Sequence, residues 1–208
     1  MVVIGLTGSI GTGKSTVSGM LARLGAYIID ADALVKELQQ PGSPILAEIE
    51  REFGNVFTSP GILDRSKLAD IVFRDPEKLK RLNEVIHPRV IERTKQLLQN
   101  YRRQNPRGVA VIDAPLLLEA GMDKLVDEVW VVACDEETQV KRVMERDKLG
   151  REEVLRRIRA QMPLNEKIRR AHRVIWTDVP LPETERQIRN AYEQVAGGVR
   201  SWQQGGGY

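Results

Sequence analysis

The sequence has almost no cysteine and no long apolar run. Cys134 is the single cysteine among 208 residues, which excludes an internal disulfide and offers no cysteine-based metal cluster. No apolar run approaches the roughly 20 residues that a membrane-spanning helix needs. A strand-like run follows Met1 directly, where a secretory signal would show its charged and apolar regions. We therefore expect a soluble, cytoplasmic protein without membrane contact, in which Cys134 is a small buried residue ending a strand.

The sequence is also short of net charge, but the charge that it has is unevenly spread. The formal net charge is +3, and 41% of the residues are apolar, enough for one main domain with a smaller appended lobe. The stretch from Lys141 to Arg173 nevertheless carries twelve Lys or Arg and five Asp or Glu. It could be a nucleic-acid surface, a pair of solvated helices, or a lid over an anionic ligand.

A glycine-rich motif lies six residues into the chain. Gly8-Ser-Ile-Gly-Thr-Gly-Lys-Ser15 matches the P-loop pattern G-x-x-x-x-G-K-S. A β-branched apolar run at 2–6 precedes it, and apolar residues at helical spacing follow it over 17–24. The context of strand, glycine loop and helix favours a phosphate-binding loop over an incidental glycine turn.

Each residue type in this loop suits a polyphosphate. Backbone N–H groups at a helix N-terminus bind phosphate oxygens, and Gly8, Gly11 and Gly13 allow the close approach. Lys14 can reach the β and γ phosphates, while the hydroxyl of Ser15 can ligate the bridging Mg²⁺. Because a P-loop places an anion nearby, we favour a lid for the basic stretch and expect no nucleic-acid partner.

Carboxylates follow two of the predicted strands. Asp30 and Asp32 come at the end of the second strand, where ligands of open α/β sheets lie. If the chain stays extended there, both side chains point to the same side and are candidates for a base and a metal-side carboxylate. Alternatively, Asp30 caps the next helix. Asp113 ends a buried strand and is a candidate for holding Mg²⁺ as a Walker-B Asp does.

The remaining pattern predicts alternating strands and helices. Predicted strands cover 2–6, 27–30, 108–113, 128–133 and 173–176, and residues 33–105 are predicted to be helical without a convincing strand. Asp75-Pro76 predicts one helix start and His87-Pro88 the start of a second, longer helix. Two basic helices are predicted within 136–163, with a break at 147–150. His87 alone is more often a structural histidine than a catalytic one.

Taken in order, these motifs resemble the dephospho-coenzyme A kinase family over nearly the whole chain. The matching residues are Gly5 to Ser15, Asp30 to Asp32, Pro41 to Pro44 leading to Phe53-Gly54, Leu63 to Arg65, Val72-Phe73, His87-Pro88, Asp113 to Leu117 with Glu119, Arg142 with Arg146-Asp147, and Gln161. The resemblance implies transfer of the ATP γ-phosphoryl group to the ribose 3′-hydroxyl of dephospho-coenzyme A.

The resemblance also implies an α/β fold in three parts. A five-stranded parallel P-loop kinase core would comprise 1–32, 106–134 and 164–199. A helical acceptor-binding region would cover 33–105 and a two-helix lid 135–163, and we expect a flexible tail at 200–208.

Site residues are implied position by position. Gly11, Thr12, Gly13, Lys14, Ser15 and Thr16 would hold ATP; Asp32 would be the base; Lys14 and Arg142 would act on the transferring phosphate; Arg65 and His87 would lie on the acceptor side; Ser15 and Asp113 would hold Mg²⁺. In two places the chain departs from the family pattern. Thr177 stands where the family usually has an Asn near the adenine, and Lys36 replaces a usual Arg, so that a point charge replaces a fork.

Other functions are less consistent with the sequence. A different small-molecule P-loop kinase would share the loop, the base and the arginines, but the helical insertion and His87-Pro88 favour the coenzyme A precursor as acceptor. A regulatory GTPase would usually carry Asn-Lys-x-Asp, which the sequence lacks. The sequence gives no oligomeric state.

Overall fold

The computed structural model describes residues 1–72 and 74–201, with side chains up to residue 197. Phe73 and the end of the predicted tail, from residue 202, lie outside this description. Two compact units are present: Met1–Ile29 joined by the chain from Leu97 onward, and Asp30–Gln96 between them. The acceptor-binding region expected at 33–105 begins three residues later and ends nine residues later than this second unit. None of the helices in the described ranges combines the length and apolar character that crossing a bilayer needs.

The first unit is built on a five-stranded parallel sheet, which confirms the predicted α/β fold class. The strands are β1 (Val2–Gly8), β2 (Tyr27–Asp30), β5 (Val109–Asp113), β6 (Glu128–Ala133) and β7 (Arg173–Trp176), in the order β2-β5-β1-β6-β7. β1 pairs with β5 on one side and β6 on the other. These central strands are mainly apolar because a parallel sheet is covered on both faces.

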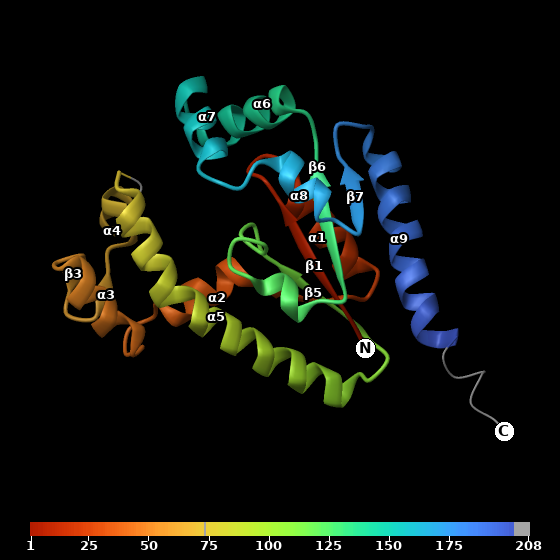
Figure 1. Cartoon of the computed structure of the whole chain (residues 1–208), viewed down its shortest axis with the longest axis horizontal. Coiled ribbons are helices and arrows are strands. Elements are labelled where there is room, and N and C mark those ends of the chain that lie inside the picture. Colours follow the sequence, from red (N-terminus) through yellow and green to blue (C-terminus); the bar gives the residue numbers. More distant parts are fainter. Residues whose placement is uncertain (73, 202–208) are drawn as a thin grey trace. The chain divides into compact units, whose positions relative to one another are not determined.

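Helices α1 (Lys14–Arg23) and α9 (Leu181–Ser201) contribute to the main hydrophobic core with alternate residues of the strands. The cluster includes Ile4, Leu6, Val17, Leu21, Val111, Trp130, Val132, Ile175 and Ile188. Successive strand residues point to opposite faces, so residues two apart share the face that packs on these helices. Figure 1 shows α9 running beside β7.

The first unit also contains a 3₁₀ turn, η1 (Met122–Leu125), and the helices α6 (Glu136–Asp147), α7 (Arg151–Arg159) and α8 (Leu164–Arg169). The predicted break between two basic helices is confirmed, since α6 ends at a left-handed Lys148 and Gly150 precedes α7. Helix α8 was not predicted, because it is six residues long and its buried residue is Lys167, which gives no apolar period.

The second unit contains α2 (Ala31–Leu38), α3 (Ile45–Phe53), β3 (Phe57–Ser59), β4 (Ile62–Leu63), α4 (Arg65–Val72) and most of α5 (Pro76–Gln104). The prediction of helices alone was wrong here, because β3 and β4 form an antiparallel hairpin. Its strands are too short and too polar to show a strand-like alternation. Gly61, at a φ of 75°, provides the left-handed turn between them.

Helix α5 is continuous through Pro88, so the predicted start at His87 was wrong. The start predicted at Asp75-Pro76 is confirmed, because the Asp75 carboxylate accepts hydrogen bonds from the N–H groups of Glu77 and Lys78. An interior proline removes a helical hydrogen bond, a cost of about 3 kcal/mol. Buried apolar residues on both sides of Pro88, such as Ile86 and Val90, offset this cost and keep the helix continuous.

Leu21 provides a direct test of the main core. Its side chain is fully buried in the cluster, so we predict that Leu21→Ala lowers the free energy of unfolding by about 2–5 kcal/mol. The matched control is Leu181→Ala at an exposed leucine, expected to change it by less than about 0.5 kcal/mol. Urea unfolding measures both, and equal effects would contradict the assigned core.

Candidate active site

The loop between β1 and α1 leaves backbone N–H groups open at the N-terminus of α1. Gly13 precedes the first helical residue at a φ of 85°, and no side chain caps the helix. The first N–H groups of a helix lack intrahelical partners, and the helix dipole adds positive potential there. A phosphate group is the ligand that such a terminus suits best.

Gly11 is required by the packing of the protein as well as by its backbone angle. Its φ is 81°, and a Cβ there would lie 2.7 Å from the Gln139 carbonyl oxygen and 2.8 Å from a Val143 methyl. Both neighbours belong to α6, which therefore lies directly against the loop. The absence of a side chain at Gly11 therefore allows α6 of the same chain to pack closely on the loop. The motif alone does not reveal this role.

The ammonium of Lys14 pairs with the carboxylate of Asp113, side chains that are 16% and 9% exposed. The pairing follows from the topology: β1 and β5 are neighbours in the sheet, with Leu6 opposite Asp113. Sequence reasoning placed both groups at the carboxyl edge of the sheet, and the structure brings them into contact.

Gln161 joins the first half of the loop to the segment after α7. Its side-chain oxygen accepts hydrogen bonds from the Ile10 N–H at 3.0 Å and the Ser9 hydroxyl at 3.1 Å. The Ile10 side chain packs on the small cluster formed by α6 and α7 around Val143 and Val154. The loop conformation is thus held by contacts more than 100 residues away in sequence.

A buried ion pair anchors the residue that follows Gln161. The Met162 N–H donates to Glu119, which also pairs with the ammonium of Lys167 at 2.9 Å. Lys167 is fully buried and donates to the Pro115 carbonyl at 2.6 Å. Burial lowers the pKa of Lys167, and the pairing with Glu119 opposes that shift. Sequence reasoning quoted Glu119 and Gln161 without a role and missed Lys167, which no motif marks.

Arg142 lies beside the loop and contacts Thr177. Its guanidinium donates to the Thr177 hydroxyl at 2.9 Å and to the Thr177 carbonyl at 2.6 Å. A Cβ on Gly13 would lie 3.7 Å from the Arg142 nitrogen. Arg146 lies four residues further along α6, and its guanidinium pairs with Asp147. Only Arg142 of the two contacts Thr177.

Comparisons with known proteins agree with this geometry. The family model described as Dephospho-CoA kinase matches residues 2–183. The chain belongs to the dephospho-CoA kinase family.

Named relatives extend the match over most of the chain. Dephospho-CoA kinase of Symbiobacterium thermophilum is 48% identical over 95% of this chain and 83% of its own length. The Moorella thermoacetica enzyme of the same name is 45% identical, covering 94% of this chain and 92% of its own. The solved structure of dephospho-CoA kinase from Campylobacter jejuni superposes with a TM-score of 0.68 at 27% identity, covering 94% of this chain and 98% of its own.

In this member of the family, Asp30 and Asp32 have different structural positions. Helix α2 begins at Ala31, and the Asp30 carboxylate caps it by accepting the Ala33 N–H at 3.0 Å. The capping alternative for Asp30 is therefore confirmed. The extended chain that would have aligned the two carboxylates was wrong, because the helix starts between them. Asp32 lies exposed in its first turn.

The two predicted acceptor-side residues, Arg65 and His87, lie in the second unit together with Asp32. Arg65 opens α4, and its guanidinium donates to the Lys36 carbonyl at 3.1 Å. His87 is half-buried on α5, one residue before Pro88. The phosphate-loop residues and Asp113 belong to the first unit.

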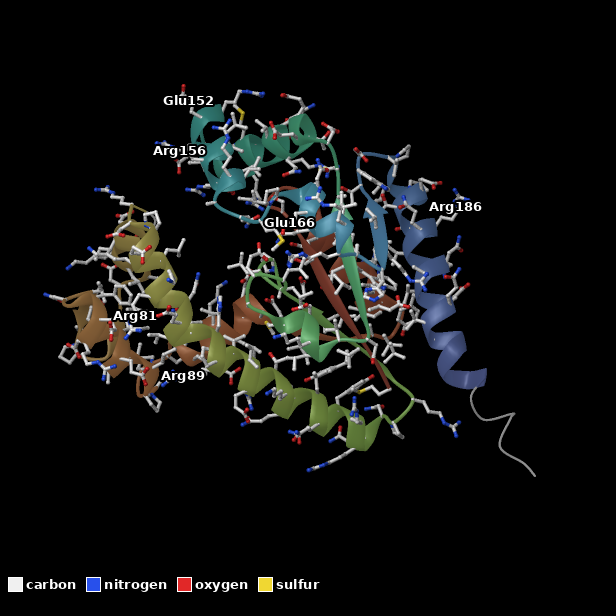
Figure 2. All side chains as sticks on the ribbon, viewed as in Figure 1. Arg81, Arg89, Glu152, Arg156, Glu166 and Arg186 are labelled. Atoms are coloured by element: carbon white, nitrogen blue, oxygen red, sulfur yellow. The ribbon has the colours of Figure 1, made fainter. Side chains whose placement is uncertain are left out.

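Many side chains of the basic stretch have acidic partners. The pairs are Arg146 with Asp147, Arg151 with Glu137, Arg156 and Arg157 with Glu153, Lys167 with Glu119, Arg170 with Glu166, and Arg173 with Glu128. Figure 2 shows Glu152 and Arg156 projecting outward from α7. Most of these pairs are at least partly exposed to solvent, whereas Arg142 lies beside the phosphate loop.

Cys134 directly follows β6 and is buried, as the sequence predicted. Burial raises the pKa of its thiol from the ordinary 9.0 to about 11. The thiolate is the reactive form, so the native protein holds about 100-fold less of it at pH 8, each pKa unit being tenfold. We predict that an aromatic disulfide reagent labels Cys134 at least that much more slowly in the native protein than in denaturant. Equal rates would show an accessible thiol.

Proposed function

We propose that this protein transfers the γ-phosphoryl group of ATP to the ribose 3′-hydroxyl of dephospho-coenzyme A, giving coenzyme A and ADP, the last step of coenzyme A synthesis. Membership of the dephospho-CoA kinase family carries the proposal. The phosphate loop at α1, with Lys14 beside Asp113, supports it in chemical terms.

Catalysis of this reaction rests on positioning and on charge stabilisation. The N–H groups of the loop from Gly11 to Thr16 bind the β and γ phosphates at the positive end of α1. The Lys14 ammonium neutralises charge that develops between these phosphates. The Arg142 guanidinium, close to Gly13, approaches the same phosphates from α6.

The Ser15 hydroxyl and the Asp113 carboxylate would hold Mg²⁺. Both are hard oxygen ligands, the type that this ion prefers, and a site of one or two protein oxygens completed by phosphate oxygens and waters is usual for it. When bound, the ion would neutralise charge on the phosphates. Asp113 also contacts Lys14, so the donor set fits a magnesium–phosphate site.

The second unit supplies the acceptor side in this proposal. Asp32 takes the proton of the ribose hydroxyl, and Arg65 and His87 bind the acceptor within the helical region 33–105. Residues 135–163, which contain α6 and α7, form the lid, and the rest of the first unit is the nucleotide-binding core. We place the reaction in the cytoplasm.

The acceptor decides between this function and another P-loop kinase. ADP release from ATP and Mg²⁺ is measured with dephospho-coenzyme A, adenosine and a panel of nucleosides. We expect rapid turnover with dephospho-coenzyme A and little with the others. Preferential phosphorylation of a nucleoside would overturn the proposed substrate and retain the kinase chemistry.

Lys14→Ala tests the phosphate loop. We predict loss of turnover with the fold retained, because the ammonium acts on the phosphates and contributes little to the core. Lys124→Ala, at an exposed lysine of η1, is the matched control and keeps wild-type turnover. Circular dichroism verifies folding. Normal turnover by folded Lys14→Ala would contradict the loop assignment.

Asp32→Asn tests the base. Asparagine keeps the size of the side chain but accepts no proton, so we predict a fall in turnover of about 10² or more with ATP affinity nearly unchanged. Asp30→Asn is the control, because asparagine caps a helix as well as aspartate. Steady-state kinetics and calorimetry measure both variants. If Asp30→Asn lost turnover and Asp32→Asn kept it, the base would be the wrong carboxylate.

A further inference from the structure

Thr177, the first residue after β7, bonds to two other segments at the carboxyl edge of the sheet. Its N–H donates to the Ala133 carbonyl at the end of β6, at 2.9 Å. Its hydroxyl oxygen lies 2.7 Å from the Thr12 carbonyl of the phosphate loop and 3.3 Å from the Ala133 carbonyl. One short side chain therefore fixes the loop after β7 against the phosphate loop.

Arg142 reaches the same residue from α6. One nitrogen of its guanidinium donates to the Thr177 hydroxyl and another to the Thr177 carbonyl, at 2.9 and 2.6 Å. Two parallel N–H bonds from a planar fork fix its orientation as well as its position. Thr177 thus determines where this guanidinium lies.

The hydroxyl has a single hydrogen, which decides the direction of these bonds. The Thr12 carbonyl is the nearer acceptor and takes that hydrogen, which leaves the oxygen lone pairs for the Arg142 N–H. The Thr177 hydroxyl is therefore a bridge: it donates to the phosphate loop and accepts from the arginine. A methyl group in its place would remove both bonds.

The bridge lies next to Gly13, the residue that precedes α1. A Cβ on Gly13 would lie 3.5 Å from the Thr177 hydroxyl oxygen and 3.7 Å from the Arg142 nitrogen. We infer that Thr177 is a positioning residue, whose hydroxyl holds the Arg142 guanidinium beside Gly13 for contact with the phosphates of ATP. The inference rests on the proposed function and adds a residue to its machinery.

Two substitutions at Thr177 separate the hydroxyl from the shape of the side chain. Thr177→Val keeps the shape of the side chain but loses the two hydrogen bonds of the hydroxyl, one to the Thr12 carbonyl and one from Arg142. We expect kcat/KM for ATP to fall about tenfold, the scale of a hydrogen bond to a charged group. Thr177→Ser retains the hydroxyl and restores most of the activity. The control is Thr184→Val, which removes another buried hydroxyl, bonded at 3.3 Å to the Trp176 carbonyl, and should not change kcat/KM.

A double-mutant cycle with Arg142→Ala gives the readout that a merely structural role would not produce. If Thr177 acts through Arg142, Thr177→Val has no further effect on kcat/KM in the Arg142→Ala background. An equal loss in both backgrounds overturns the inference, and so does wild-type kcat/KM in Thr177→Val.

The same cycle is measured by calorimetry as the affinity for a non-hydrolysable ATP analogue with Mg²⁺. This arm separates the inference from the proposed function. If the wild-type protein failed to phosphorylate dephospho-coenzyme A, the proposed function would fall. Non-additive affinities would still support the bridge, and additive affinities would overturn it.

Discussion

The glycine-rich loop that leaves backbone N–H groups open at the N-terminus of α1 is the constraint on which the rest of the first unit depends. A loop rich in glycine has little tendency to keep one conformation, because glycine loses more conformational freedom on folding than any other residue. The loop is therefore held by other segments: α6 lies against Gly11, Gln161 bonds to Ser9 and Ile10, and Thr177 bonds to Thr12. Preorganisation of the N–H groups is what makes such a site effective for catalysis.

Two ion pairs flank the segment after β5. Lys14 pairs with Asp113, and the buried Lys167 pairs with Glu119. A buried ion pair contributes little net stability, because desolvation offsets the attraction between the charges. A positional role explains the Lys167–Glu119 pair better than stability does. Glu119 also accepts a hydrogen bond from the Met162 N–H, so the pair fixes the residue next to Gln161.

The strands of the parallel sheet, the phosphate loop and the split between α6 and α7 could be predicted from the sequence because each has a local signal. Contacts between residues far apart in the sequence have no such local signal. Thr177 was visible only as a departure from the family pattern, and its bonds to Thr12 and Arg142 depend on how β7 is placed beside β6. Lys167 was counted only as one of the twelve basic residues between Lys141 and Arg173, whereas the fold buries it completely. In the second unit, the start of α2 at Ala31 separated two carboxylates that an extended chain would have aligned.

Hydrogen exchange at single-residue resolution tests the central claim most directly, namely that the loop from Ser9 to Thr16 and the bridge at Thr177 together hold the nucleotide phosphates. The protein is compared alone and with a non-hydrolysable ATP analogue and Mg²⁺. The account predicts slower exchange at the amides of residues 9–16 and 177–178, with little change in the middle of α9. Unchanged exchange in residues 9–16 under conditions where calorimetry shows the analogue bound would contradict it.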